Sequence, residues 1–249
     1  MITERRYKQI LKGLEERGVV QVKDLVKELQ VSESTIRRDL QDLMNQGKLE
    51  RVHGGAKKLP SLEEESFEEK SSQKLLEKKK VAKTAALLIQ DGDTIFLDAG
   101  TATQAILPYL KDRRVHVVTN SLPHGVELCN SKVACSLIGG EVKNNTKAIV
   151  GPAALDQMKQ FKFDKAFIGV NGLHPDYGFT TAEKREGQLK SLALSQAKEA
   201  YILADSSKFL KVYPVKFGNL NEAIVLTDPL TKEDSSLFQA LTNILEAKE

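Results

Sequence analysis

A loop rich in glycine and hydroxyl groups follows the apolar run 94–97. A loop of this kind, between a strand and a helix, presents backbone N–H groups and the positive end of the helix to an anion. Its leading aspartate supplies a carboxylate that can accept hydrogen bonds from ligand hydroxyls. Many strand-to-helix turns with the same composition bind nothing. The residues of this candidate anion-binding loop are Asp98, Gly100, Thr101, Ala102 and Thr103.

Small and polar residues also follow the other apolar runs that we expect to be strands. The carboxyl ends of parallel strands meet at one edge of a sheet, where ligands bind, so the pattern predicts a polar pocket there. The alternative is that glycine, asparagine and serine are only turn formers. The residues are Asn120 and Ser121 after 115–119, Gly139 and Gly140 after 133–138, Asn171 and Gly172 after 165–170, and Asp205 and Lys208 after 200–204.

A second candidate site lies on a helix that we expect to begin after Ser32, a good N-cap residue. Ile36, Leu40 and Leu43 fall on one face of this helix, and polar or basic residues fall on the other. A helix that enters the major groove of DNA needs long polar side chains outside and packing inside. The alternative is a solvated helix in a three-helix bundle. The outward residues are Ser34, Thr35, Arg37, Arg38 and Gln41.

The elements that position these residues divide into two domains. Residues 1–58 show three short amphipathic helices and then an alternating stretch, 48–55, that is typical of a hairpin or wing. Residues 59–76 carry a proline, serines and an acidic cluster, so we expect an exposed linker that becomes helical toward its C-terminal end. Residues 77–249 form the larger domain.

The larger domain alternates helices with short apolar strands, which predicts an α/β fold. We expect strands at 94–97, 115–119, 133–138, 165–170, 200–204 and 223–226, and helices at 78–89, 183–198 and 233–247. Such alternation favours a mostly parallel sheet covered on both faces.

Composition excludes several classes of protein. The chain has 249 residues and a net charge of +3, and its positive charge lies in residues 1–58, which hold 13 basic and 9 acidic side chains. No apolar run is long enough to span a bilayer, and the N-terminus lacks a signal-peptide core, so we expect a cytoplasmic protein with no membrane partner. Cys129 and Cys135 are too few for a structural zinc site, and we expect no metal and no cofactor.

The stretches Val31-Ser-Glu-Ser-Thr-Ile-Arg-Arg-Asp-Leu40 and Arg51-Val-His-Gly-Gly-Ala56 resemble the DeoR family of bacterial sugar-metabolism repressors. The resemblance implies a winged helix-turn-helix that binds operator DNA. It adds Ser32 in the motif, and Arg51 and His53 in the wing, to the candidate DNA contacts. Helix-turn-helix proteins usually bind DNA as symmetric oligomers, so we expect a homo-oligomer, a dimer or a tetramer.

The larger domain resembles the sensor domain of the same family, which is similar to ribose-phosphate isomerases and glucosamine-phosphate deaminases. The resemblance implies a phosphorylated sugar at Asp98, Gly100 and Thr101, although Ala102 stands where the family usually has a second threonine. A second family segment appears here as Thr180, Thr181, Glu186 and Lys190, without the usual proline. Lys147, Lys190 and Lys208 are available to offset phosphate charge.

The segments 96–101, 146–148, 165–167 and 205–209 are similar to those of fructose-operon repressors, which implies fructose 1-phosphate as the effector. Lactose-operon repressors of the family also look similar, and they imply tagatose 6-phosphate. A sugar-phosphate isomerase or deaminase with a DNA-binding appendage is the third hypothesis. We expect no enzyme, because the catalytic aspartate and glycine-rich lysine segments of the isomerases are not found in this sequence.

Overall fold

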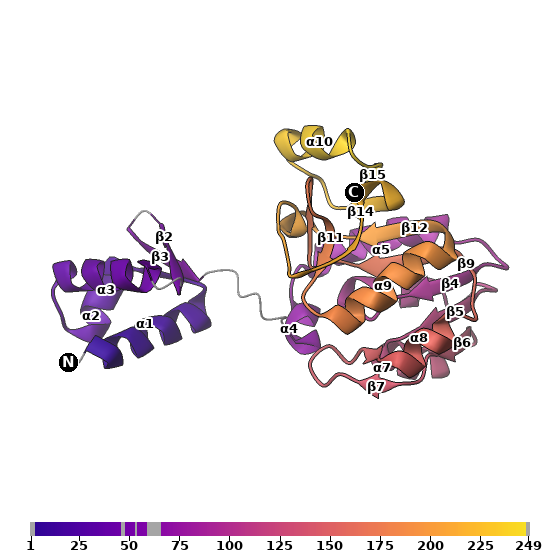
Figure 1. Ribbon diagram of the computed structural model, residues 1–249, viewed down its shortest axis with the longest axis horizontal. Helices are drawn as coiled ribbons and strands as arrows, with labels where there is room; N and C mark the ends of the chain where they lie inside the picture. The colour runs from indigo at the N-terminus through magenta and orange to yellow at the C-terminus, as the bar shows by residue number, and fades with distance from the viewer. Residues whose placement is uncertain (1–2, 46–47, 53, 59–65, 248–249) are drawn as a thin grey trace. The chain divides into compact units, whose positions relative to one another are not determined.

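We describe a computed structural model of the chain at residues 3–45, 48–52, 54–58 and 66–247 (Figure 1). The chain divides into two compact units, Met1–Leu62 and Glu63–Glu249. No helix among the described residues is long and apolar enough to cross a membrane.

The first unit is a three-helix bundle with a three-stranded sheet. The strand order is β1-β3-β2 and both pairings are antiparallel. The hairpin of β2 and β3 confirms the predicted wing, whereas β1 is too short to be seen in the sequence. The elements are α1 (Thr3–Arg17), β1 (Val19–Gln21), α2 (Val22–Leu29), α3 (Glu33–Asn45), β2 (Leu49–Val52) and β3 (Gly55–Lys58).

The core of the first unit follows the helical spacing of its apolar residues. Ile10, Ile36, Leu40 and Leu43 are fully buried and pack in one cluster. Glycine is required at position 55, where β3 pairs with β1, because a Cβ atom there would lie 2.1 Å from the carbonyl oxygen of Val20. The wing is therefore fixed to the bundle by backbone pairing.

The second unit is built on a seven-stranded, fully parallel sheet in the order β15-β14-β12-β9-β4-β5-β6. Its strands are β4 (Thr94–Leu97), β5 (His116–Thr119), β6 (Ala134–Leu137), β9 (Phe163–Gly169), β12 (Ala197–Leu203), β14 (Ile224–Thr227) and β15 (Ile244–Glu246). Its α-helices are α4 (Phe67–Ser72), α5 (Leu75–Leu88), α6 (Thr101–Gln104), α7 (Leu122–Cys129), α8 (Pro152–Met158), α9 (Lys184–Gln196) and α10 (Lys232–Gln239).

Helices cover both faces of this sheet, as predicted from the alternation of elements (Figure 1). Side chains alternate between the faces of a strand. Phe96 of β4 accordingly joins a core cluster with Leu189 of α9, while Ile95 and Leu97 join another with Val81 of α5. The sheet is thus sandwiched between two hydrophobic layers.

The order of strands places the centre of the sheet at β4 and β9. From β4 the chain proceeds outward through β5 to β6, then returns to β9 and proceeds the other way through β12 to β14 and β15. Two adjacent loops therefore leave β4 and β9 in opposite directions. Open α/β sheets bind ligands in the crevice at this point.

The predicted helix at 233–247 is wrong in its second half. The helix α10 ends at Gln239, and Ile244–Glu246 forms the edge strand β15 beside β14. Thr242 donates a hydrogen bond to the carbonyl oxygen of Ala223 at 2.9 Å, which directs the chain back to the sheet. Backbone pairing at the edge of the sheet outweighed the local helical pattern.

Two small antiparallel sheets were not predicted. One pairs β7 (Glu141–Val142) with β8 (Ile149–Val150), and the other has the order β10-β11-β13. The second consists of β10 (Gly172–His174), β11 (Gly178–Thr181) and β13 (Val215–Gly218). Their strands lie in segments that follow the parallel strands β6, β9 and β12, so they shape the surroundings of the carboxyl edge.

Candidate functional site

The third helix of the first unit, α3, presents a polar surface. Ser34, Arg37, Arg38 and Gln41 are exposed, and Thr35 is half-buried. The Ser32 hydroxyl accepts a hydrogen bond from the backbone N–H of Thr35 at 3.3 Å, which confirms the predicted cap. The helix is thus held by its apolar face and its N-terminus while its basic side chains remain accessible.

The wing strand β2 is joined to α3 through Arg51. Its guanidinium donates to the carbonyl oxygen of Arg37 at 3.1 Å, and its Nε is buried with no hydrogen-bond partner among the described residues. Arg37 itself is paired with Glu33, one helical turn earlier, at 2.6 Å. His53, the other predicted wing contact, lies outside the described residues.

A buried ion pair that sequence reasoning missed connects α1 to α3. Arg6 Nε and Nη2 donate to the two carboxylate oxygens of Asp39 at 2.7 and 2.9 Å. The hydrogen bond to Asp39 raises the pKa of Arg6 above its usual value. Asp39 falls on the same face as Ile36, Leu40 and Leu43, so a charge at a core position was the available signal.

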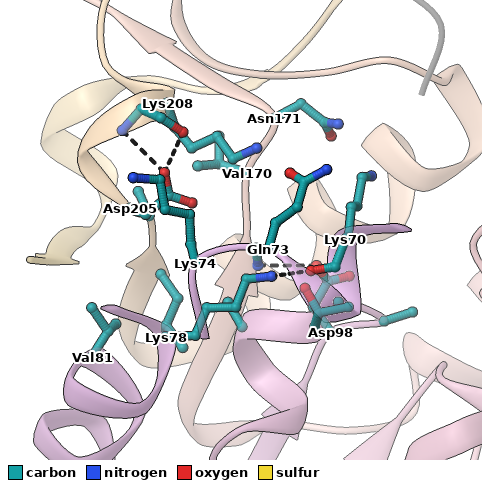
Figure 2. Close-up of a pocket in the computed structure, with 18 of the residues that line it drawn as sticks. Lys70, Gln73, Lys74, Lys78, Val81, Asp98, Val170, Asn171, Asp205 and Lys208 are labelled. Atoms are coloured by element: carbon teal, nitrogen blue, oxygen red, sulfur yellow. Dashed lines mark hydrogen bonds between the residues drawn. The ribbon is translucent and has the colours of Figure 1, made fainter. Parts of the chain in front are cut away.

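The second unit contains a cavity of about 130 Å³ at the carboxyl ends of β4, β9 and β12 (Figure 2). This is the point where the strand order reverses. Nine of the predicted effector residues line the cavity: Asp98, Gly100, Thr101, Ala102, Asn171, Glu186, Lys190, Asp205 and Lys208. The strand-end pattern therefore predicted lining residues that follow three neighbouring strands, and the family resemblance added Glu186 and Lys190 of α9.

A buried ion pair forms the floor of the cavity. The Lys190 ammonium donates to Oδ2 of Asp98 and, at 2.9 Å, to the carbonyl oxygen of Gly169. The backbone N–H of Gly169 donates to the same Asp98 oxygen at 3.0 Å. The side chains of Lys190 and Asp98 are only 5% and 4% exposed. The pair therefore joins β4, β9 and α9 beneath the position where a ligand would lie.

The candidate anion-binding loop is held in shape from within. The Thr103 hydroxyl is buried. It lies within hydrogen-bond distance of two backbone carbonyl oxygens, that of Asp98 at 2.6 Å and that of Gly100 at 2.8 Å, and can donate to either. Thr103 consequently does not line the cavity, whereas Thr101 and Ala102 do. Within this loop, Thr101 is the hydroxyl-bearing residue that lines the cavity.

The buried side chain of His124 contacts the backbone of the candidate anion-binding loop. Its Nε2 lies 3.2 Å from the carbonyl oxygen of Gly100, to which it can donate. Burial lowers the pKa of His124 to about 4, against the opposing effects of Gly100 and Asp98. The imidazole is therefore neutral near pH 7 and acts as a hydrogen-bonding strut.

This shift predicts a pH dependence of stability. Because the unfolded chain binds the proton between about pH 6.5 and pH 4 and the folded chain does not, acidification over that range should cost about 3 kcal/mol at His124. His124→Gln keeps an N–H donor but has no titrating ring. Its free energy of unfolding, measured with urea, should therefore fall by about 3 kcal/mol less than that of wild type between pH 7 and pH 4. An NMR titration in which every histidine protonates above pH 6 would contradict the assignment.

The other predicted effector residues lie outside the lining of the cavity and make structural contacts. The Asn120 amide accepts from the N–H of Ala99 at 3.1 Å and donates to Ile149, so it braces the loop after β4. Ser121 caps α7, and Gly139 donates to Gln157. Gly140 and Gly172 stand where a Cβ atom would meet a carbonyl oxygen at 2.7 and 2.4 Å.

Thr180, Thr181 and Lys147 also make internal contacts. Thr180 donates to the carbonyl oxygen of Gly172 at 2.9 Å, and Thr181 donates to the side-chain oxygen of Asn171 at 2.9 Å. Lys147 pairs with Glu68 at 3.5 Å. Thr181 thus orients a residue that does line the cavity.

Glu186 is the second buried carboxylate in the lining of the cavity, beside Asp98. It accepts from the Lys143 ammonium and from the Thr146 hydroxyl, each at 2.6 Å. These partners come from the segment between β7 and β8, which sequence reasoning did not connect with the pocket. The ion pair fixes that segment against the start of α9.

Sequence reasoning also missed one wall of the cavity. Lys70, Gln73, Lys74 and Lys78 line it from α4 and the beginning of α5. These residues precede the sheet in the chain, so the strand-end rule could not find them. Among the described residues, no group of three or more His, Cys, Asp or Glu side chains could hold a metal ion.

Both units match known domains. Residues 6–61 match the DeoR-like helix-turn-helix domain, and residues 73–229 match the DeoR C terminal sensor domain. The chain is 43% identical over 229 residues to the "Uncharacterized HTH-type transcriptional regulator FruR" of Bacillus subtilis, covering 91% of each chain. It is 36% identical over 255 residues to the lactose phosphotransferase system repressor of Lactococcus lactis, covering 99% of this chain and 100% of the repressor.

Among solved structures, ribose 5-phosphate isomerase A from Methanocaldococcus jannaschii is similar to part of the chain. It is 20% identical with a TM-score of 0.40, and the match covers 54% of each chain. The two domain matches and the full-length relatives agree along the sequence. The chain belongs to the DeoR family of transcriptional regulators.

Proposed function

We propose that this protein represses a sugar-utilisation operon and that a phosphorylated sugar, fructose 1-phosphate, releases it from operator DNA. The observation that carries the proposal is the cavity at the reversal of strand order, which combines a buried Asp98–Lys190 pair with the Thr101 hydroxyl and further lysines. Carboxylate and hydroxyl groups suit sugar hydroxyls, and ammonium groups suit a phosphate dianion.

The DNA-binding half of the proposal rests on α3 and the wing. Exposed Arg37, Arg38 and Gln41 share a helix whose other face is buried, which is the arrangement that major-groove recognition needs. We further propose that residues 1–58 hold the DNA contacts, that the predicted linker 59–76 connects them to the sensor at 77–249 and adds α4 to the wall of its cavity, and that the protein acts as a symmetric dimer or tetramer. Symmetry would double the length of operator that is read.

Fructose 1-phosphate is favoured over tagatose 6-phosphate by the segments shared with fructose-operon repressors. The 43% identity to FruR supports this choice, while the lactose phosphotransferase system repressors keep tagatose 6-phosphate as the second candidate. Both sugars are ketohexose phosphates, which a site distinguishes through a few hydrogen bonds. The two ligands therefore belong in one titration.

The test is an electrophoretic shift on the DNA upstream of the gene, with two reciprocal variants. Arg38→Ala should weaken operator binding by about 1 to 3 kcal/mol and leave the midpoint of sugar-phosphate release unchanged. Thr101→Val, which removes a hydroxyl without changing shape, should leave operator binding unchanged and raise that midpoint about 10-fold. Thr101 is preferable to Asp98 because the Asp98 carboxylate also holds Lys190.

Fructose 1-phosphate should release wild type, and unphosphorylated fructose should not. A wild-type protein that stays on DNA with every hexose phosphate would refute the proposed effector class. NMR spectra of the same mixtures test the enzyme hypothesis. Conversion of a sugar phosphate would favour an isomerase or deaminase.

A further inference from the structure

The corner between α4 and α5 gives one wall of the cavity an unusual concentration of positive charge. Lys70, Lys74 and Lys78 all line the cavity from this corner (Figure 2). Together with Lys190 and Lys208 they make five lysines, against three acidic residues in the lining. The lining therefore carries a formal charge of +2.

The three acidic residues of the lining already have partners of their own. Asp98 is bonded to Lys190, and Glu186 to Lys143 and Thr146. Asp205 accepts from the hydroxyl and the backbone N–H of Ser207. On the α4–α5 side, Lys74 pairs with Glu77 at 3.5 Å, and Lys70, Lys74 and Lys78 line the cavity together with Lys208.

The backbone of the corner directs its lysines to one place. Lys74 adopts a left-handed conformation with φ +52°, which turns the chain sharply between α4 and α5. The Lys78 ammonium donates to the carbonyl oxygen of Lys70 across the turn. A dianion bound in the cavity beside these ammonium groups would be attracted by each of them.

The helix α4 also contacts the segment between β7 and β8, which in turn contacts the cavity. The N–H of Phe67 donates to the carbonyl oxygen of Asn145 at 2.9 Å, and Glu68 pairs with Lys147 at 3.5 Å. The same segment between β7 and β8 supplies Lys143 and Thr146 to Glu186. Two walls of the cavity are therefore connected to this helix.

We propose that the α4–α5 corner binds the phosphate group of the effector and that this binding fixes α4, the first described helix after the boundary between the units. The inference rests on the proposed function, in which the effector is a sugar phosphate. The second unit begins at Glu63 and α4 at Phe67, so α4 is the described helix of this unit nearest in sequence to the DNA-binding unit. Ligand binding and operator binding would then be linked, each lowering the affinity for the other by the same factor.

Calorimetric titration of the full chain with fructose 1-phosphate, and separately with inorganic phosphate, tests the corner. Lys74→Gln is the informative variant because the Lys74 side chain lines the cavity, is 48% exposed and makes only a surface ion pair with Glu77 at 3.5 Å among the interactions described. It should bind both ligands about 10-fold more weakly than wild type and bind operator DNA normally. Lys79→Gln is the matched control, since Lys79 is an exposed lysine of α5 outside the lining.

Hydrogen–deuterium exchange tests the effect on α4. Fructose 1-phosphate should slow exchange of the amides of residues 67–78 in wild type, and unphosphorylated fructose should not. Equal affinities of wild type and Lys74→Gln for both ligands would overturn the corner as the phosphate site. Weakened binding in Lys74→Gln with unchanged exchange at 67–78 in wild type would overturn the fixing of α4.

The inorganic phosphate titration separates this inference from the proposed function. A wild-type protein that binds phosphate, with weaker binding in Lys74→Gln, but binds no sugar phosphate would support the corner and refute the proposed effector. A wild-type protein that binds fructose 1-phosphate, with no change in Lys74→Gln, would support the effector and refute the corner. Binding of neither ligand would contradict both.

Discussion

Replacement of Asp39 by asparagine should destabilise the first unit by about 3 to 5 kcal/mol, because it leaves the Arg6 guanidinium buried without its counter-charge. The two residues join α1 to α3 through two hydrogen bonds, so the loss also loosens the helix that carries the candidate DNA contacts. Urea unfolding should show an early transition for this unit, and operator binding should be lost while sugar-phosphate binding by the second unit persists.

The matched control for Asp39→Asn is Glu33→Gln on the same helix. Glu33 and Arg37 form an exposed ion pair, so removing it should cost less than about 1 kcal/mol. The double variant Arg6→Met/Asp39→Leu should recover most of the stability, since an apolar pair can replace a buried ion pair. Equal stabilities of Asp39→Asn and Glu33→Gln would show that the buried pair does not hold α1 to α3.

The second large effect is expected at the floor of the cavity. Lys190→Met should leave the buried Asp98 carboxylate without its counter-charge and with the Gly169 N–H as its remaining donor among the described residues. The expected cost to the second unit is about 3 to 5 kcal/mol. Sugar-phosphate response should disappear together with the ammonium group. The measurements are the urea midpoint of the second unit and the operator titration with fructose 1-phosphate.

A double variant separates stability from ligand binding at this pair. Asp98→Asn/Lys190→Met removes both charges, so it should be more stable than Lys190→Met alone. It should nevertheless fail to respond to the sugar phosphate, because the groups that face the ligand are gone. A double variant no more stable than Lys190→Met, or one that still responds, would contradict the assigned role of the pair.

Local periodicity was enough to predict most elements of the fold. Ile36, Leu40 and Leu43 are the buried face of α3, and the apolar runs at 94–97 and 165–170 are the central strands β4 and β9. These patterns report which side of an element is buried. They contain no information on edge pairing, which is why Ile244–Glu246 was predicted as helix although it pairs with β14.

The candidate site was predicted in part for a related reason. Asp98, Asn171 and Asp205 follow β4, β9 and β12, which are neighbours in the sheet, so all three reach the cavity. Asn120 and Gly139 follow β5 and β6, which lie on the other side of β4, and they brace surrounding loops instead. Strand order decides between these outcomes, and it depends on pairings between distant segments. Lys74 was missed because it comes from the turn between α4 and α5 rather than from a strand end.

The pairing of β4 with β9 has a consequence for the order in which the protein matures on the ribosome. Ile95 pairs with Lys165 and Asp98 with Lys190, the latter across 92 residues of chain, so the cavity cannot form until α9 has been synthesised. The first unit has all of its internal pairings within Met1–Leu62 and is free to fold as soon as it emerges. Closing the longer loop is slower as well as later. A nascent chain therefore acquires its helix-turn-helix fold well before it acquires the cavity.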